Sequence, residues 1–257
     1  MLKLEGIGKT FFKGTVNEKV AAENLNLHVN KGDFITIIGG NGAGKSTLFN
    51  LISGSIIADE GRIILDGEDI TYKPEYKRAK KIGRIFQDPL KGTAPNMTVE
   101  ENLSLSYCRG RGKNFSIGIS KKERELFREI LRELDLGLED RMKTKMGLLS
   151  GGQRQAITLI MATIVTPKLL LLDEHTAALD PATSKKVIEL TESIINRDKI
   201  TALMITHNIK SALLQGNRTL MLRDGKIIMD ISGEERARET VGSILERFDI
   251  DDDALVL

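Results

Sequence analysis

Residues 39–47, which read GGNGAGKST, carry the strongest chemical signal in the sequence. They fit G-x-x-x-x-G-K-[ST], the pattern of a phosphate-binding P-loop. The apolar run 34–38 before them predicts a buried strand, and residues 46–52 predict a helix. A tight turn between the two directs backbone N–H groups and the positive end of the helix dipole to one point, where phosphate binds. The alternative is a glycine-rich turn that binds nothing, and the flanking strand and helix argue against it.

Two side chains in this loop have predicted roles. Lys45 is expected to reach the terminal phosphates, and the Ser46 hydroxyl is expected to ligate Mg²⁺. Glycines are expected around them because side chains would block the close approach of the backbone to phosphate, and because some positions need a positive φ.

Two adjacent carboxylates follow a second apolar strand, in LLLLDE at 169–174. Asp173 suits the coordination shell of Mg²⁺, directly or through water. Glu174 is placed to face the terminal phosphate, where it would orient a water or accept its proton. Alone, the pair could be acids at a helix N-terminus, favoured by the helix dipole. The P-loop upstream makes the magnesium and phosphate roles the better interpretation.

The stretch LSGGQRQ at 149–155 predicts a second glycine-lined helix N-terminus, and hence a second anion site. A single P-loop already holds one nucleotide, so the extra site makes sense if it closes over a nucleotide held by another copy. The alternative is a capped helix with a flexible entry, which the motif alone would favour.

Alternating strands and helices predict an α/β fold with a mostly parallel sheet covered on both faces. Lys45, Gln87, Asp173 and His207 each follow a predicted strand. Ligands sit at the carboxyl ends of the strands in such sheets, so we expect the four side chains to converge on one phosphate chain. Lys45, Mg²⁺ and His207 would neutralise the charge that develops during phosphoryl transfer.

The stretch from 88 to about 167 is helical in character and predicts a subdomain inserted into the α/β core. Residues 98–107 form a predicted helix with a capping box of Thr98 and Glu101, and residues 120–136 form an amphipathic one capped by Ser120. The glycine-rich basic link 109–113 between them predicts a surface loop, and the acidic tail 249–253 is expected to fray.

Two other features have open interpretations. Phe11 and Phe12 are adjacent aromatics in a chain with only 4% aromatic residues, and either could stack on an adenine ring or close the edge of a small sheet. The basic run 77–81 indicates a solvated helix face rather than a phosphate or lipid contact.

Composition narrows the class of protein. A net charge of +2 gives no indication of nucleic-acid binding, and a single cysteine, Cys108, excludes an internal disulfide framework. The mixed N-terminus predicts no secretory signal, and no apolar run approaches the roughly 18 residues of a membrane span. Work at a membrane would therefore require a partner protein.

Taken together, the motifs resemble the ATP-binding subunits of ABC transporters over nearly the whole chain. GGNGAGKST, LSGGQRQ, LLLLDE and AALD (177–180) occur in the order and spacing of that family, with Gln87 and His207 between and after them. The resemblance implies a P-loop NTPase core at 1–87 and 168–257, with an N-terminal antiparallel β-subdomain and an inserted α-helical subdomain at 88–167. These would form one ATPase domain over 1–257.

The resemblance also implies roles for individual residues in a head-to-tail dimer that sandwiches two ATP molecules. Glu174 resembles the catalytic base, His207 the residue that holds the γ-phosphate, and Gln87 the link between nucleotide and permease. Ser46, Gln87 and Asp173 would surround Mg²⁺. Asp180 would lie at the dimer seam, and Phe11 matches the adenine-stacking position better than Phe12. The residues expected to bind nucleotide, in one copy or the other, are Phe11, Gly39, Asn41, Gly42, Ala43, Gly44, Lys45, Ser46, Thr47, Gln87, Ser150, Gly151, Gly152, Asp173, Asp180 and His207.

One residue departs from the family pattern. His175 follows the expected catalytic Glu174, where the family usually has proline or another small residue. A titratable ring at this place could alter the pKa of the base, but we favour a packing role.

DEHTAALDP, with GTAPNM after Gln87, is similar to the ATPases of bacterial importers of the tryptophan and tyrosine type. We therefore expect a peripheral subunit at the cytoplasmic face of the membrane, which hydrolyses ATP to power import through a separate permease. A coupling helix of that permease would bind near residues 87–96, and a substrate-binding protein would complete the system. One alternative is a soluble ABC-type ATPase without a transport role, such as one that serves iron–sulfur cluster assembly. A small-molecule P-loop kinase would leave LSGGQ unexplained.

Overall fold

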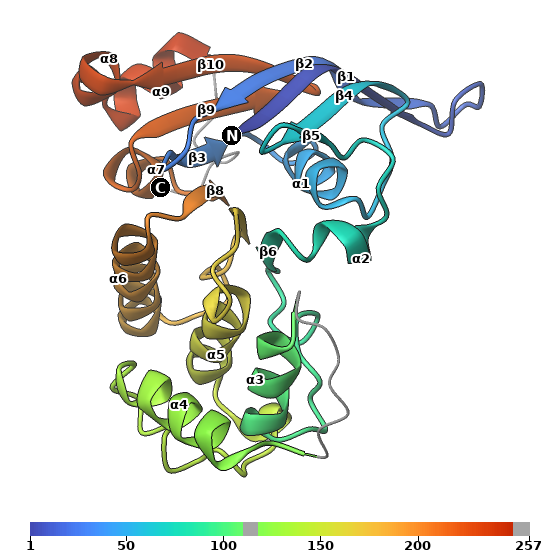
Figure 1. Ribbon diagram of the computed structural model, residues 1–257. Helices are drawn as coiled ribbons and strands as arrows, with labels where there is room; N and C mark the ends of the chain where they lie inside the picture. The colour runs from blue at the N-terminus through green and yellow to red at the C-terminus, as the bar shows by residue number, and fades with distance from the viewer. Residues whose placement is uncertain (110–117, 249–257) are drawn as a thin grey trace. The chain divides into compact units, whose positions relative to one another are not determined.

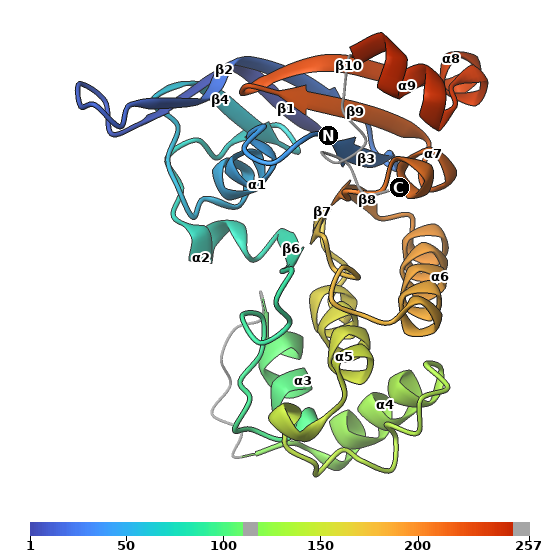
Figure 2. The same ribbon diagram turned by 180° about the vertical axis from the view of Figure 1, so that it is seen from behind.

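The computed structural model describes residues 1–109 and 118–248 and divides into two compact units (Figures 1 and 2). The first unit contains Met1–Ala79 and the chain from Ile200 onward, and the second contains Lys80–Lys199. Most of the predicted link 109–113 and all of the acidic tail 249–253 lie outside the described residues.

An antiparallel sheet forms one part of the first unit, as the predicted β-subdomain requires. Its strands are β1 (Leu2–Phe11), β2 (Lys19–Val29), β4 (Glu60–Leu65) and β5 (Glu68–Asp69), in the order β2-β1-β4-β5. Leu25, Leu27 and Val29 of β2 alternate with polar residues and are buried, because alternate side chains point to the same face of a strand. Asp66 and Gly67, with φ of 55° and 80°, form the turn between β4 and β5.

Parallel strands form the other part of the first unit. β3 (Phe34–Ile38) lies between β8 (Thr201–Ile205) and β9 (Arg218–Arg223) and is parallel to both. All five residues of β3 are buried, which explains its unbroken apolar run. β10 (Lys226–Ser232) pairs antiparallel with β9 through the turn at Asp224 and Gly225. The mostly parallel sheet that we predicted is confirmed.

Five helices among the described residues accompany these strands in the first unit: α1 (Lys45–Ser53), α2 (Glu75–Arg78), α7 (Ile209–Leu214), α8 (Gly233–Arg238) and α9 (Val241–Phe248). Two of these helices, α8 and α9, lie beside β10 (Figure 1). Thr240 separates them because its hydroxyl oxygen accepts a hydrogen bond from the backbone N–H of Ser243, 3.1 Å away, and starts α9 anew. Ile244 of α9 packs against Ile38 and Met221.

The prediction of a solvated face for residues 77–81 is wrong for Arg78, which is only 2% exposed. Its guanidinium donates to the carbonyl oxygens of Leu51 (2.7 Å) and Ile52 (3.0 Å), in the last turn of α1. It also donates to the carbonyl oxygens of Thr71 and Lys73. The planar fork of arginine satisfies several carbonyls at once, so Arg78 fixes the C-terminal end of α1.

The second unit combines two parallel strands with helices. β6 (Ile82–Ile85) pairs with β7 (Leu169–Asp173), and the helices are α3 (Val99–Tyr107), α4 (Lys121–Arg132), α5 (Gly151–Thr163) and α6 (Pro181–Asp198), with the short 3-10 helix η1 (Met146–Leu148) before α5. The capping boxes that we predicted at Thr98 and Ser120 are both present. Helix α4 ends at Arg132, short of the predicted 136, because the chain turns at Asp135, whose φ is 51°. Within the described ranges, no helix has the length and apolar character that a membrane span needs.

Candidate functional site

The predicted P-loop forms the turn between β3 and α1 in the first unit. Gly39, Gly42 and Gly44 have φ of 146°, 82° and 103°, a region that residues with a side chain rarely adopt. A Cβ atom on Gly39 would lie 2.3 Å from the carbonyl oxygen of Leu222, and one on Gly44 would lie 2.7 Å from that of Ala21. Glycine is therefore required at both positions by neighbouring backbone as well as by φ.

Lys45 is only 6% exposed, and its ammonium lies along the inside of this loop. Nζ donates to the carbonyl oxygens of Gly39 at 2.6 Å and Gly40 at 3.1 Å. The residue before it, Gly44, is the N-cap of α1 and has no side chain to accept bonds from the first N–H groups of the helix. Phosphate oxygens are suitable acceptors for those N–H groups.

A turn far along the chain braces the loop from outside. The backbone N–H of Gly225 donates to the carbonyl oxygen of Ala43 at 3.0 Å, and the carbonyl oxygen of Gly225 accepts from the N–H of Glu23 at 2.9 Å. Gly225 has a φ of 74°, and a Cβ there would lie about 3.0 Å from the backbone of Ala21. The P-loop is thus tied through one glycine to β2.

His207 follows β8 and lies at the same edge of the sheet as the P-loop. In the pairing of β3 with β8, Ile37 is opposite Ile205, and the N–H of Thr206 donates to the carbonyl oxygen of Ile37 at 3.1 Å. Asn208 then caps α7, because its side chain accepts from the N–H of Ser211 at 2.7 Å. Two of the four polar groups expected to converge therefore follow neighbouring strands of this unit.

The two adjacent phenylalanines differ in their surroundings. Phe11 is the last residue of β1 and pairs with Lys19, and the ammonium of Lys9 lies 5.8 Å from the centre of its ring. Phe12 is 70% exposed with a φ of 52° and begins the turn toward β2. Phe11 thus closes a strand edge and Phe12 faces solvent, and an adenine-stacking role for either stays a prediction.

The other two predicted groups, with Glu174, follow the paired strands of the second unit. Ile85 of β6 is opposite Leu172 of β7, so Gln87 and the carboxylates Asp173 and Glu174 come from the same edge. Glu174 has a φ of 45°, in the left-handed region. His175 is 4% exposed, and its Nε2 lies 3.2 Å from Oγ1 of Thr191 in α6. Burial lowers the pKa of its ring from 6.5 to about 4.

The sequence analysis missed a cation beside Asp173. Nη2 of Arg84 lies 3.5 Å from Oδ2 of Asp173, and the two side chains are 11% and 13% exposed. The guanidinium carbon of Arg84 also lies 4.6 Å from the centre of the Phe86 ring. An arginine inside the otherwise apolar strand 82–85 was the signal that could have revealed this pair.

The predicted second anion site is the first turn of α5. Oγ of Ser150 accepts from the N–H of Gln153, and Oε1 of Gln153 accepts from the N–H of Ser150, both at 3.3 Å. Nη1 of Arg141 donates to the same Oε1 at 3.1 Å. The segment is therefore a capped helix start, as the alternative interpretation expects, and its role as an anion site stays a prediction.

Gly152 lies where α5 and α6 approach each other closely. A Cβ atom on Gly152 would lie 2.1 Å from Cγ2 of Thr183. Asp180 is the N-cap of α6, and its Oδ1 accepts from the N–H of Thr183 at 3.1 Å. Its hydrogen bonds with Thr183 lower the pKa of the Asp180 carboxyl. The starts of the two helices are thus fixed against each other at one glycine.

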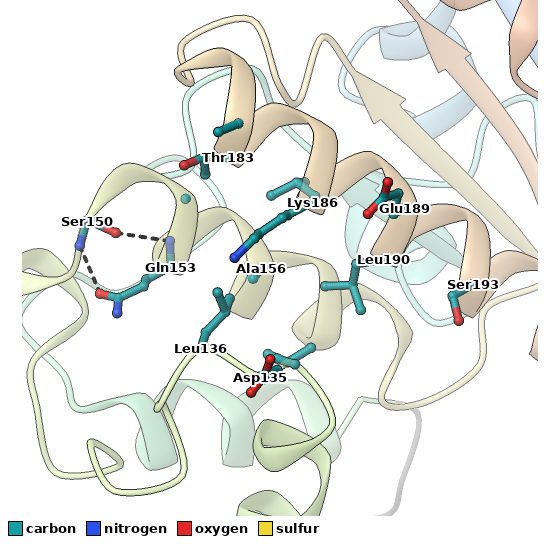
Figure 3. Close-up of a pocket in the computed structure, with 14 residues that line it drawn as sticks. Asp135, Leu136, Ser150, Gln153, Ala156, Thr183, Lys186, Glu189, Leu190 and Ser193 are labelled. Carbon is teal, nitrogen blue, oxygen red and sulfur yellow. Dashed lines mark hydrogen bonds between the residues drawn. The ribbon is translucent and has the colours of Figure 1, made fainter.

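A cavity of about 600 Å³ opens beside these helix starts (Figure 3). Ser150 and Gln153 of α5 lie at one end, and Thr183 and Lys186 of α6 line another side. The remaining lining residues are Leu134, Asp135, Leu136, Gly152, Ala156, Ala182, Val187, Glu189, Leu190 and Ser193. The cavity is lined by charged side chains, Asp135, Lys186 and Glu189, and by apolar ones.

Comparison with known proteins agrees with these features. Residues 22–177 match the sequence model of the family described as ABC transporter. The chain is 45% identical over 249 residues to a tyrosine transport ATP-binding protein of Clostridioides difficile, covering 97% of this chain and 99% of the relative. It is 35% identical over 248 residues to the spermidine/putrescine import ATP-binding protein PotA of Pasteurella multocida, but spans only 62% of that longer protein.

Solved structures of ATP-binding cassettes are also similar to this chain. A dimeric post-hydrolysis structure of the ATP-binding cassette MJ0796 bound to ADP and Pi has a TM-score of 0.77 at 30% identity, covering 90% of this chain and 98% of the other. The ADP conformation of the cassette MJ1267 has a TM-score of 0.79 at 30% identity, covering 98% and 99%. The expected mixed α/β fold, with an antiparallel and a parallel-rich sheet, is confirmed. The chain belongs to the ABC transporter family, as an ATP-binding subunit that hydrolyses ATP.

Proposed function

We propose that this subunit powers the import of an amino acid through a separate membrane permease, to which it binds at the cytoplasmic face. The observation that carries the proposal is 45% identity over nearly the full length of both chains to a tyrosine transport ATP-binding protein. The PotA relatives, named for import, support the direction of transport. An extracytoplasmic substrate-binding protein belongs to the proposed system, and nucleic acid does not.

We assign the phosphates of ATP to the P-loop, from Gly39 to Thr47. Gly39 and Gly44 allow the positive φ and the close backbone packing of this turn, and Lys45 adds a buried positive charge. His207, which follows β8 at the same edge of the sheet as the P-loop, would hold the terminal phosphate. Glu174 would orient the attacking water and take its proton, and Phe11 would stack on adenine.

The chain's oxygen donors fit Mg²⁺. Ser46, Gln87 and Asp173 offer a hydroxyl, an amide oxygen and a carboxylate, the hard ligands that Mg²⁺ prefers. No cluster of three or more His, Cys, Asp or Glu side chains that could hold a metal occurs in the part of the chain that the structure describes. A small number of protein ligands is sufficient for Mg²⁺, because the ion keeps water molecules and substrate phosphates in its coordination shell. When bound, Mg²⁺ would neutralise negative charge on the phosphates.

A second copy would complete each site. We propose that Ser150, Gly151 and Gly152 of one copy contact the nucleotide on the P-loop of the other, with Asp180 at the seam between copies. The N-terminus of α5 suits a phosphate, and the MJ0796 cassette forms a dimer. In this proposal residues 1–257 act as one ATPase domain, with its core at 1–87 and 168–257 and its helical part at 88–167.

The test is reconstitution. The chain, purified from membranes with the subunits that accompany it, is placed in vesicles that enclose Mg²⁺-ATP, and uptake of labelled tyrosine is measured. We expect uptake that stops with Glu174→Gln. Purification without any permease, together with steady ATP hydrolysis by the free chain, would instead support a soluble ATPase.

A further inference from the structure

His175 has a fixed place between the proposed base and the middle of α6. Glu174, the residue before it, directly follows β7, and α6 begins six residues after His175, at Pro181. His175 is 4% exposed, and Thr191, in the middle of α6, is 1% exposed. Both lie in the second unit, so their contact depends on no other part of the chain.

The hydrogen bonds around Thr191 define how the ring is bound. Oγ1 of Thr191 lies 2.7 Å from the carbonyl oxygen of Val187, one helical turn earlier, and donates its single hydrogen to it. At its contact with His175, 3.2 Å away, the same oxygen must therefore accept. Nε2 of His175 carries a hydrogen and donates it to Thr191, and the ring is anchored to α6 through a neutral N–H group.

Glu174 needs such an anchor. Its φ of 45° lies in the left-handed region, which is strained for a residue with a side chain. A conformation of this kind persists only where its neighbours hold it. Strand β7 holds the chain before Glu174, and the hydrogen bond from the N–H of Ala177 to the carbonyl oxygen of Glu174, at 3.0 Å, closes the turn after it. The buried side chain of His175 is the fixed point between the two.

We propose that His175 is a positioning residue for ATP hydrolysis, which holds the Glu174 backbone in its left-handed conformation through a hydrogen bond to Thr191. The inference rests on the proposed role of Glu174 as the base. A proline or a small residue at this position could not make this bond.

The test uses Thr191, because it lies in α6 and is not part of the proposed nucleotide site. Thr191→Val removes the acceptor and should lower kcat about tenfold, since a small displacement of a catalytic group is costly. The KM for ATP should change less than about twofold, because binding does not depend on Glu174. Thr191→Ser keeps the acceptor and should retain kcat. His175→Leu should match Thr191→Val, and the double variant should be no slower than either, since both remove the same bond.

The control is Thr163→Val in α5. Oγ1 of Thr163 donates to the carbonyl oxygen of Leu159 at 2.8 Å, in the same manner as Thr191, and Thr163 is 7% exposed. It should lower thermal stability comparably and leave kcat unchanged. Equal losses of kcat in both valine variants, or full kcat with Thr191→Val, would overturn the inference.

A second readout needs no ATP. The chain has three histidines, so nitrogen-15 NMR of labelled histidine resolves each ring. We expect His175 to be neutral with its hydrogen on Nε2 in the free protein, and its signals to shift with Thr191→Val. A hydrogen on Nδ1 would contradict the inference. Full ATP hydrolysis by Glu174→Gln would instead reject the proposed base, and with it the proposed function of this site.

Discussion

Replacing Gly152 by alanine separates two reasons for a glycine at the start of α5. One is the close packing against Thr183, and the other is the proposed contact with the nucleotide of a second copy. The added Cβ would lie 2.1 Å from Cγ2 of Thr183, well inside contact distance, while its distance to Cβ of Thr183 would be 3.5 Å, an ordinary contact. The obstruction is thus one methyl group, on a β-branched side chain whose χ1 is stiff. Thr183→Ser removes that methyl group and keeps the hydroxyl.

The magnitude follows from two opposing terms. Forcing an extra carbon into a packed contact costs about 1–3 kcal/mol. Alanine in place of glycine within a helix stabilises by about 1 kcal/mol. Gly152→Ala should therefore lower the free energy of unfolding by up to about 2 kcal/mol. In the double variant with Thr183→Ser, the free energy of unfolding should lie within about 1 kcal/mol of the parent protein.

Urea unfolding of the parent, both single variants and the double variant measures these differences through the midpoint and slope of each transition. ATP hydrolysis of the double variant then tests the functional reason. If Gly152 also contacts the nucleotide of a second copy, the double variant is folded and still hydrolyses ATP slowly. A Gly152→Ala protein more stable than the parent, or one whose loss Thr183→Ser fails to restore, would refute the packing argument.

Three further predictions concern the proposed site. Lys45→Ala should abolish ATP binding, because it removes the buried ammonium of the loop, and unchanged nucleotide affinity by calorimetry would count against the P-loop assignment. Glu174→Gln should slow hydrolysis by orders of magnitude and leave an ATP-bound dimer, and a monomer in light scattering with ATP and Mg²⁺ would oppose the composite site. His175 has a pKa near 6.5 when unfolded and about 4 when folded, so the unfolded chain binds its proton first and stability is lost as pH falls through this range. Between pH 7.5 and 5 the loss should be about 2 kcal/mol greater in the parent than in His175→Gln, as measured by urea unfolding at each pH, and parallel profiles would show that the ring titrates normally.

Features encoded by local pattern could be predicted from the sequence. The strand before the P-loop and the capping boxes at Thr98 and Ser120 each depend on a few consecutive residues, and all are present. The candidate site shares this property, because its residues follow strand ends in recognisable motifs.

Features that depend on distant parts of the chain could not be predicted. The burial of Arg78 follows from carbonyl groups at 51, 52, 71 and 73, which periodicity cannot place beside it. The pairing of Arg84 with Asp173 requires the β6–β7 register, which connects residues 89 positions apart. The partner of His175 likewise lies in the next helix. In each case the residue is visible in the sequence, but the group that satisfies it is not.

The tie between Gly225 and the P-loop allows nucleotide affinity to be altered from a position outside the loop. Gly225 belongs to a hairpin turn with no chemistry of its own, yet it holds Ala43 on one side and Glu23 on the other. Any larger residue there would press on the backbone of Ala21 and shift the loop, so the backbone dipoles proposed to bind phosphate would have to be reordered each time ATP binds. A variant of the hairpin could therefore weaken ATP binding while every residue of the P-loop motif stays intact.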